Sequence, residues 1–280
     1  MLRVDQTLLQ QVIVSRQSDS YKGDYGRLLL IGGTYPYGGA IMMSALAAVE
    51  SGAGLVTVAT DQENIHALHS QLPEAMAFAV TDQELLADQI AKAGVILLGP
   101  GLKDNDLGTH LVQLVFDRVQ SHQVLILDGG AISIYTRLAL PLPQAQLVFT
   151  PHQKEWETMS GLAIGDQGEE ATRQSLSQLP PASILVQKGP QTKIWQQGQA
   201  DYYQLTVGGP YQATGGMGDT LAGMIAGFAG QFPQVGLYER VVVATHLHSA
   251  IAEDLSKEVY VVLPTAISKE IPKWMKKNSQ

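Results

Sequence analysis

The sequence predicts an α/β protein built on a mainly parallel central sheet with helices on both faces. Short apolar runs recur along the 280 residues, and each is followed by glycine or proline and then by a segment of helical periodicity. Most runs are continuously apolar, as in strands that are covered on both faces. Because 45% of the residues are hydrophobic and no linker or repeat interrupts them, we expect a single domain over residues 1–280.

The apolar runs give the strands in chain order. They are Arg27–Ile31, Leu55–Ala59, Val95–Leu98, Val124–Leu127, Leu147–Phe149 and Ile184–Gln187. Helices with one apolar face are predicted between them, over Gly39–Ser51, Asp82–Lys92, Leu107–Ser121, Gln153–Ser160 and Glu169–Leu179.

The alternation of single strands and helices ends after Ile184–Gln187. Thr192–Gln196 and Tyr202–Leu205 are separated by a glycine-containing turn and are predicted to form a hairpin. Two long helices follow, over Asp219–Gln231 and Val235–Leu255. The glycines at 223, 227 and 230 predict that the first of these helices packs closely against a neighbour.

The composition disfavours several classes of protein. The formal net charge of −8 would repel a nucleic acid, and the basic cluster Lys273–Lys277 is interpreted as a solvated tail. The absence of cysteine excludes disulfides, thiolate metal sites and a cysteine nucleophile. Because no apolar run approaches about 20 residues and no signal peptide is evident, we expect a cytoplasmic protein that does not enter a membrane.

The strongest functional motif is Thr214-Gly215-Gly216-Met217-Gly218-Asp219. Its glycines allow successive backbone N–H groups to point inward as an anion-binding nest, and the helix that follows would direct its N-terminus to the same point. There Asp219 would stay ionised and available as a base. A helix cap would explain Asp219 alone, but it does not require Gly215, Gly216 and Gly218 before it.

The segment after the fifth strand has a structural and a functional interpretation. Thr150 as N-cap, Pro151 at the first helical position and Gln153 three residues after the cap are predicted to form a capping box. This leaves His152 and Glu155 unexplained, at the edge of the sheet where ligands of open α/β proteins bind.

Further glycine-rich loops end other strands at the same edge. Lys188-Gly189 could hold a nucleotide phosphate or begin a turn, and Gly99-Pro100-Gly101 and Asp128-Gly129-Gly130 could be turns alone. The segment Gly32–Ala40 has neither the Lys-Ser/Thr of a Walker A loop nor dinucleotide-fingerprint spacing. The concentration of such loops at one edge favours ligand binding over turn chemistry.

In their order along the chain these motifs resemble those of the ADP/ATP-dependent NAD(P)H-hydrate dehydratases, in the ribokinase-like superfamily. The resemblance extends from Lys22-Gly23-Asp24-Tyr25-Gly26 to His246-Leu247-His248, most of the chain. Thr150-Pro151-His152 followed by the Gly-Gly-x-Gly-Asp loop distinguishes this family from sugar and vitamin kinases. The resemblance implies a ribokinase-like fold and ADP- or ATP-dependent dehydration of the S epimer of hydrated NADH or NADPH, called NADHX and NADPHX.

The resemblance also implies roles for residues. Asp219 would accept the proton of the ring hydroxyl as it attacks the terminal phosphoryl group, whose charge the nest at Gly215, Gly216 and Gly218 would stabilise. Mg²⁺ would bridge the phosphates, with Glu155 acting through water. Contacts with the hydrated cofactor correspond to Ala40, Gly101, His152 and Asp219, and contacts with the nucleotide to Lys188, Gly189, Pro190, Gln191, Thr192 and Gly218.

One motif of this chain departs from the family pattern. The resemblance also implies two kinds of partner, a separate epimerase and further copies of the same chain. Asp128-Gly129-Gly130-Ala131-Ile132 stands where many relatives have Asp-Ala-Asp-Ala-Leu, so Gly130 is given no polar role. The chain lacks the epimerase domain that is often fused to this one, which implies a separate epimerase. Relatives also imply a homo-oligomer, with a tetramer favoured, and a preference for ADP.

Other functions stay open at this point. A thiazole or pyrimidine kinase of the same superfamily would use Asp219 and the nest in the same way but release a stable phosphorylated product. A catalytically silent nucleotide sensor would not need an ionised carboxylate in a phosphate nest. Catalysis by a protein-bound metal and a Ser-His-Asp hydrolase are disfavoured, because neither H-E-x-x-H nor Gly-x-Ser-x-Gly occurs.

Overall fold

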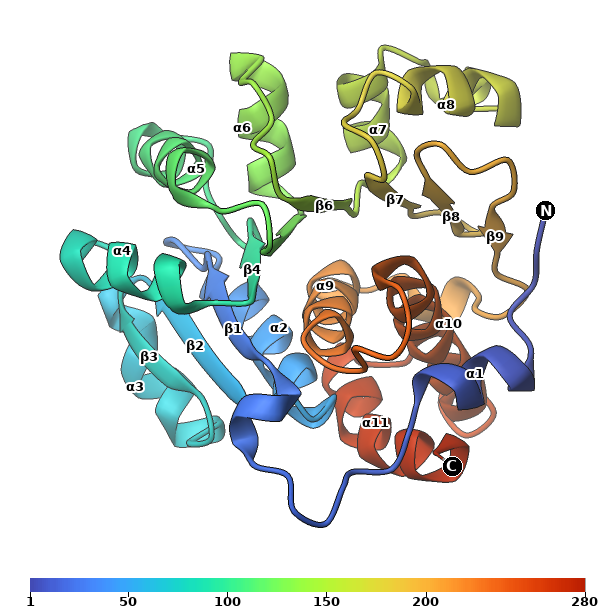
Figure 1. Ribbon diagram of the computed structural model, residues 1–280, viewed down its shortest axis with the longest axis horizontal. Helices are drawn as coiled ribbons and strands as arrows, with labels where there is room; N and C mark the ends of the chain where they lie inside the picture. The colour runs from blue at the N-terminus through green and yellow to red at the C-terminus, as the bar shows by residue number, and fades with distance from the viewer. Residues whose placement is uncertain (280) are drawn as a thin grey trace.

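A nine-stranded sheet in the order β3-β2-β1-β4-β5-β6-β7-β8-β9 forms the centre of the computed structural model, which describes residues 1–279 (Figure 1). Neighbouring strands from β3 to β7 are parallel, and β8 and β9 are antiparallel additions at one edge. The predicted mainly parallel sheet is therefore confirmed. The strands are β1 (Arg27–Ile31), β2 (Leu55–Thr60), β3 (Met76–Ala79), β4 (Val95–Leu98), β5 (Val124–Leu127), β6 (Gln146–Phe149), β7 (Ile184–Gln187), β8 (Lys193–Gln196) and β9 (Tyr203–Gln204).

Helices cover both faces of this sheet, as Figure 1 shows. On one face lie α1 (Gln6–Val12), α2 (Gly38–Glu50), α3 (Gln62–Gln71), α9 (Met217–Ala229), α10 (Leu237–Leu255) and α11 (Pro264–Asn278). On the other lie α4 (Gln83–Lys92), α5 (Asp106–Arg118), α6 (Gly130–Leu138), α7 (Gln153–Ser160) and α8 (Glu169–Leu176). Strands such as β4 and β5 are buried along their whole length, because each face of the sheet packs on its own apolar layer.

The C-terminal segment corrects one prediction. The basic cluster Lys273–Lys277 is not a solvated tail, because it belongs to α11. Ile267 and Ile271 of this helix are fully buried, and Trp274 packs against the same core. These positions repeat at helical spacing, so the lysines occupy the exposed face of an amphipathic helix.

Four further elements were not predicted from the sequence, namely α1, α3, α6 and β3. Strand β3 is short, half-exposed and at the edge of the sheet, so its apolar signal is weak.

Close packing of α2 against α9 confirms the prediction from the glycines. A Cβ atom built on Gly223 would lie 2.1 Å from the carbonyl oxygen of Ser44, and one on Gly227 would lie 2.6 Å from the Cβ of Ser51. Only glycine permits such an approach of two helix backbones. This packing places the N-terminus of α9 beside α2.

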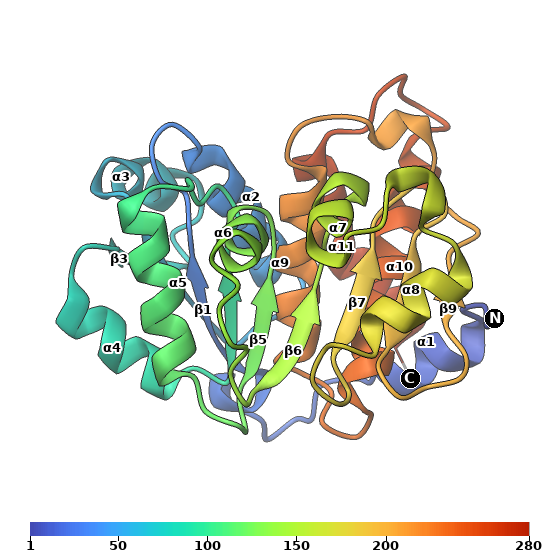
Figure 2. The same ribbon diagram turned by 90° about the horizontal axis from the view of Figure 1, so that it is seen from above.

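The topology gathers the functional loops at one edge of the sheet. After β1 the chain moves outward to β2 and β3, and it then returns to β4 on the other side of β1. Such a reversal opens a crevice beyond the carboxyl ends of the strands. The arrowheads of β5, β6 and β7 point toward this edge in Figure 2.

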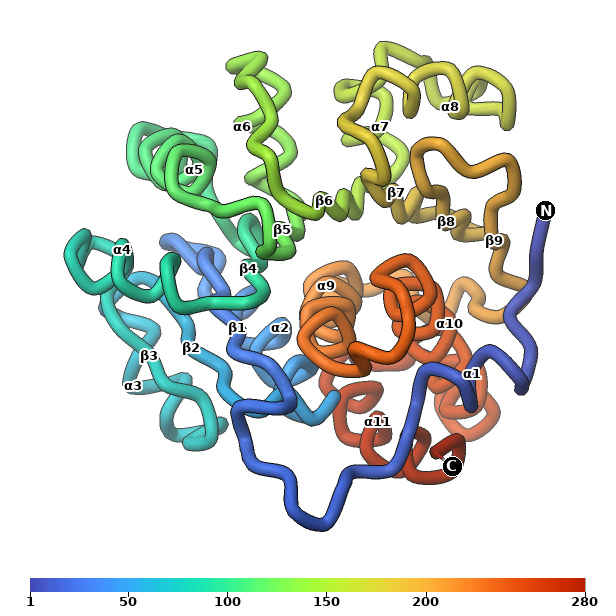
Figure 3. Tube along the Cα trace, viewed as in Figure 1, coloured from blue at the N-terminus to red at the C-terminus, as the bar shows by residue number. Residues whose placement is uncertain are grey.

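The N-terminal segment lies beside β9, the last strand of the sheet, and pairs with it through Leu2 and Tyr203 (Figure 3). Within residues 1–279, no helix is both long and apolar enough to span a membrane.

Candidate active site

Helix α9 begins at the glycine motif, two residues before the predicted start. Gly216 is its N-cap, with φ at +90°, and Met217 is its first residue. Asp219 is therefore the third residue of the helix and not its cap, so the capping explanation for Asp219 is wrong. Its side chain is half-buried and lies in the first turn, where the backbone N–H groups lack helical partners.

Helix α2 holds the first turn of α9 in place. The hydroxyl of Ser44 donates a hydrogen bond to the backbone oxygen of Asp219 at 2.8 Å and also lies 3.2 Å from the backbone oxygen of Ala40. The backbone of Asp219 and that of the predicted substrate contact Ala40 are thus connected through one side chain.

A buried ion pair lies beside the nest. The ammonium nitrogen of Lys188 is 2.9 Å from Oδ1 of Asp128, and Asp128 is only 3% exposed. The hydroxyl of Thr150 donates to the same Asp128 oxygen at 2.6 Å. The ammonium of Lys188 also reaches the nest, because a Cβ built on Gly218 would lie 3.1 Å from it. Four loops therefore meet at this point.

These charges set the protonation of the candidate base. Burial, and after it the nearby carboxylate of Asp128, raise the pKa of Asp219 from 3.8 to about 6, while the charge of Lys188 acts in the opposite direction. Although burial by itself would lower the pKa of Lys188, the carboxylates of Asp128 and Glu155 raise it overall, so Lys188 remains a cation. Asp219 is consequently ionised at pH 7 but is a stronger base than an exposed aspartate.

The start of α7 differs from the prediction. His152, and not Thr150, is the N-cap: its Nδ1 accepts hydrogen bonds from the N–H groups of Lys154 and Glu155, both at 3.1 Å. Glu155 completes the capping box by accepting from the N–H of His152 at 2.8 Å. Thr150 does not cap the helix because its hydroxyl is directed into the sheet edge toward Asp128. Because Nδ1 accepts, a proton on the ring lies on Nε2, which is 3.4 Å from Oε1 of Glu155.

A cavity of about 830 Å³ opens beside the nest. Of the predicted nucleotide contacts it is lined by Lys188, Gly189, Pro190, Thr192 and Gly218, together with His152. Gln191 lies outside this lining, and its side chain pairs with Gln204. A larger cavity of about 1100 Å³ lies near the amino ends of the strands, where it has neither the nest nor the base.

The predicted cofactor contacts Ala40 and Gly101 meet away from this cavity. A Cβ built on Gly101 would lie 2.9 Å from the Cβ of Ala40, and the φ of Gly101 is +63°. Because Ser44 bonds the backbone oxygens of both Ala40 and Asp219, this second region also borders the start of α9.

Sequence reasoning missed two residues of the site. Asp128 was interpreted as part of a turn, although its position directly after a buried strand is a signal shared with Lys188. His248 lines the cavity from α10, and burial lowers its pKa to about 4, so it is neutral. Among the described residues, no group of three His, Asp or Glu side chains is placed to hold a metal ion directly.

The fold and the site together define a class. A carboxylate in the first turn of a helix, within a glycine nest at the carboxyl edge of a mainly parallel sheet, is suited to phosphoryl transfer to an alcohol. A ribokinase-like superfamily protein of known structure from Enterococcus faecalis has the same fold, with a TM-score of 0.94 and 43% identity, covering 99% of this chain and 96% of that one. The chain is a ribokinase-like protein.

The family follows from the sequence comparisons. The model of the NAD(P)H-hydrate dehydratase family matches residues 28–273. An ADP-dependent (S)-NAD(P)H-hydrate dehydratase from Streptococcus pneumoniae is 65% identical over 273 residues, which are 98% of this chain and 94% of that protein. The chain belongs to the NAD(P)H-hydrate dehydratase family. The predicted family and enzyme class, a hydro-lyase, are confirmed, and the vitamin-precursor kinase is not favoured.

This chain is also similar to a protein whose structure was determined with a nucleotide in the crystals. The ADP/ATP-dependent NAD(P)H-hydrate dehydratase from Bacillus subtilis, crystallised with ATP and Mg²⁺, has a TM-score of 0.84 and 27% identity, covering 98% of each chain.

Proposed function

We propose that this chain dehydrates (S)-NADHX and (S)-NADPHX with ADP as the phosphoryl donor, and that Asp219 is its base. The observation that carries the proposal is the half-buried Asp219 in the first turn of α9, with a pKa of about 6 and the ammonium of Lys188 beside its nest. This is the arrangement that removal of a proton from an alcohol facing a phosphate requires.

The reaction would proceed in two steps. Asp219 accepts the proton of the ring hydroxyl while the hydroxyl oxygen bonds to the terminal phosphorus of ADP, and the bond from that phosphorus to its bridging oxygen breaks to release AMP. The ring nitrogen then donates its electron pair as the carbon–oxygen bond breaks and phosphate leaves. Loss of a proton from the adjacent ring carbon restores the double bond of the reduced cofactor.

The residues around Asp219 would stabilise the transferring phosphoryl group and hold the nucleotide. Lys188 and the N–H groups of Gly216 and Gly218 would stabilise the negative charge on the transferring phosphoryl group. Asp128 holds Lys188 at the nest, so we propose it as a positioning residue. Gly189, Pro190 and Thr192 would line the bound nucleotide, since they line the cavity that reaches this point.

The hydrated cofactor would bind on the other side of the base. Ala40 at the start of α2 and Gly101 after β4 lie against each other there, and because neither carries a large side chain the cofactor could approach their backbones closely. His152 borders the nucleotide cavity instead, so we propose that its Nε2, 3.4 Å from Oε1 of Glu155, reaches the substrate only where the two ligands meet.

The donor groups fit a magnesium ion held mainly by phosphates. Mg²⁺ retains several waters and needs few protein carboxylates, and Glu155 offers one near the cavity, where burial raises its pKa and Lys188 opposes that effect. We propose that Glu155 holds the ion through water. When bound, the ion would neutralise charge on the phosphates. The relative from Bacillus subtilis, crystallised with ATP and Mg²⁺, supports the use of this ion with a nucleotide.

The biological setting is proposed from the relatives. Their names favour ADP over ATP, as in the enzyme from Streptococcus pneumoniae. We further propose a cytoplasmic homo-oligomer, a tetramer by preference, that works beside a separate epimerase.

Recovery of absorbance at 340 nm tests the function directly. The purified chain is incubated with NADHX or NADPHX, Mg²⁺ and either ADP or ATP, and AMP and phosphate are quantified. We expect recovery with ADP at a greater rate than with ATP. No recovery with either nucleotide would refute dehydration, and a stable phosphorylated product of a vitamin precursor would favour the kinase instead.

A further inference from the structure

Two exposed tyrosine side chains stand on the loop between β1 and α2. Tyr35 is 79% exposed and Tyr37 is 55% exposed. An exposed aromatic ring leaves its apolar face in water, so two of them in one loop of three residues are a candidate binding surface. Neither residue lines the cavity that Lys188 and Gly189 border. The nucleotide bound there would leave these rings uncovered.

The loop that carries these rings is fixed by its backbone. The N–H of Gly33 donates to the oxygen of Pro100 at 2.8 Å, and the N–H of Thr34 donates to the oxygen of Gly101 at 2.9 Å. The hydroxyl of Thr34 accepts from the N–H of Lys103 at 2.8 Å. A rigid loop presents its rings at little cost in conformational entropy, which favours a role in recognition.

Tyr37 borders the region of Ala40 and Gly101, and Tyr35 is two residues before it in the same loop. A Cβ built on Gly101 would lie 3.1 Å from the Cβ of Tyr37 and 2.9 Å from that of Ala40. Two helical turns further along α2, Ser44 holds the backbone of Asp219. The spacing from Tyr37 to Ser44 is roughly 10 Å along the helix axis, at about 1.5 Å per residue. A dinucleotide that places its reacting ring at Asp219 would therefore extend toward Tyr37.

We propose that Tyr35 and Tyr37 form a stacking platform for the adenine ring of NADHX and NADPHX. The proposal rests on the proposed function and extends it to the part of the substrate that does not react. Of the two ring systems in the substrate, the hydrated nicotinamide has saturated carbons and is not flat, whereas adenine is planar and aromatic. Stacking on tyrosine thus selects the adenine end.

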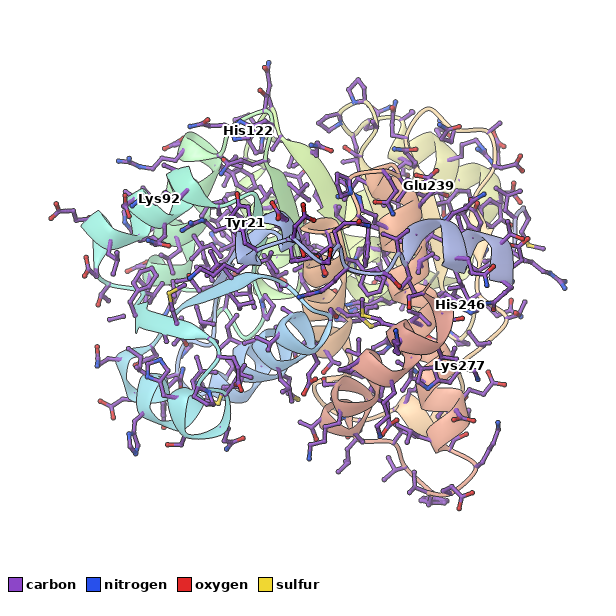
Figure 4. The ribbon with its side chains drawn as sticks, turned by 60° about the horizontal axis from the view of Figure 1, so that its bottom comes forward. Tyr21, Lys92, His122, Glu239, His246 and Lys277 are labelled. Atoms are coloured by element: carbon purple, nitrogen blue, oxygen red, sulfur yellow. The ribbon has the colours of Figure 1, made fainter. Side chains whose placement is uncertain are left out.

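Kinetics with a truncated substrate test this assignment. Steady-state kcat and KM are measured at saturating ADP with NADHX and with hydrated reduced nicotinamide mononucleotide, which lacks the adenosine half. The variants are the double variant Tyr35→Ala/Tyr37→Ala and the aromatic replacement Tyr35→Phe/Tyr37→Phe. The matched control is Tyr21→Ala, because Tyr21 (labelled in Figure 4) is 68% exposed and precedes β1 at the opposite edge of the sheet.

The alanine double variant should raise the KM for NADHX about tenfold or more, with kcat nearly unchanged, because stacking binds a part of the substrate that does not react. Its KM for the truncated substrate and its KM for ADP should equal those of the unsubstituted chain. The phenylalanine variant and the Tyr21→Ala control should retain the original KM for NADHX. An unchanged KM for NADHX, or an equal rise for both substrates, would overturn the platform. A failure of the proposed function is distinguishable, because the unsubstituted chain would then turn over neither substrate.

Discussion

At the scale of single residues, the site depends on one cation shared among three carboxylates. Lys188 forms its direct ion pair with Asp128, and its charge also reaches Glu155 and Asp219. Burial raises the pKa of Asp219 most, the carboxylates of Asp128 and Glu155 add to that rise, and Lys188 limits it. The balance leaves Asp219 ionised at neutral pH while increasing its affinity for a proton.

The amide substitution Asp219→Asn tests the base. It preserves the size of the side chain but removes its capacity to accept the proton, so turnover should fall by about 10²–10⁴-fold. The Kd for ADP, measured by calorimetry, should change little because the nest remains. Asp88→Asn, at an exposed ion pair with Lys92, is the control and should retain full activity. Near-normal turnover of Asp219→Asn would remove this residue from the role of base.

The pH profile tests the electrostatic balance. Because the deprotonated form of Asp219 is active and its pKa is raised to about 6, kcat/KM should rise with pH and level off above about 6. In Asp128→Asn one charge that raises this pKa is absent while the opposing charge of Lys188 remains, so the acid limb should move to lower pH. A limb that stays in place or moves upward would contradict the prediction that the charge of Asp128 raises the pKa of Asp219.

At the scale of elements, packed glycines position the catalytic turn. Gly223 and Gly227 allow α9 to touch the backbone of α2, and Ser44 then reaches the carbonyl of Asp219. The positive φ of Gly216 lets the chain turn directly into the helix with its N–H groups facing the site. The turn at Gly216 and the contact between α2 and α9 therefore both fix the position of Asp219.

Gly223→Ala should disturb both functions of this helix pair. The new methyl group would lie 2.1 Å from the backbone oxygen of Ser44, so the helices must separate, at a cost of about 1–3 kcal/mol or more. Thermal unfolding should show a lower Tm, by about 2–4 °C for each kcal/mol, and turnover should fall as Asp219 moves. Gly165→Ala is the control, since a Cβ there meets nothing within 4 Å. An unchanged Tm in Gly223→Ala would contradict the packing argument.

At the scale of the whole molecule, sheet topology brings together loops that are distant in the sequence. Asp128 and Lys188 are 60 residues apart, and Ser44 and Asp219 are 175 residues apart. Asp128 and Lys188 meet because parallel strands deliver their carboxyl ends to one edge, and Ser44 meets Asp219 because α2 packs closely on α9. The nucleotide would therefore bind only to the folded chain.

Ligand-dependent stability follows from this convergence. A nucleotide that binds only the folded state stabilises it by about 2.7 kcal/mol at a hundredfold excess over Kd. With Mg²⁺ present, ADP should raise the Tm by about 5–10 °C in a thermal scan. Asp219→Asn should keep this rise, and Lys188→Ala should lose most of it. If ADP at millimolar concentration leaves the Tm of the unsubstituted chain unchanged, the cavity beside the nest is not the nucleotide site.

Local patterns in the sequence determined the strands β1, β4, β5 and β7, the helix α7 and the glycine nest. Their signals lie within a few neighbouring residues: a continuous apolar run, a helical repeat, or glycines before a helix. The ordered motifs also determined the family. Weak local signals explain what was missed, such as the short edge strand β3 and the helix α11 with its proline and lysines.

The tertiary structure alone decided the charges and caps of the site. Nothing near Asp128 in the sequence indicates that it pairs with Lys188, and nothing near Thr150 indicates that its hydroxyl leaves the helix cap to His152. These choices depend on strand order and register, which bring distant groups within hydrogen-bonding distance. The pKa of Asp219 depends on burial and on those neighbours, so it too is a property of the folded chain.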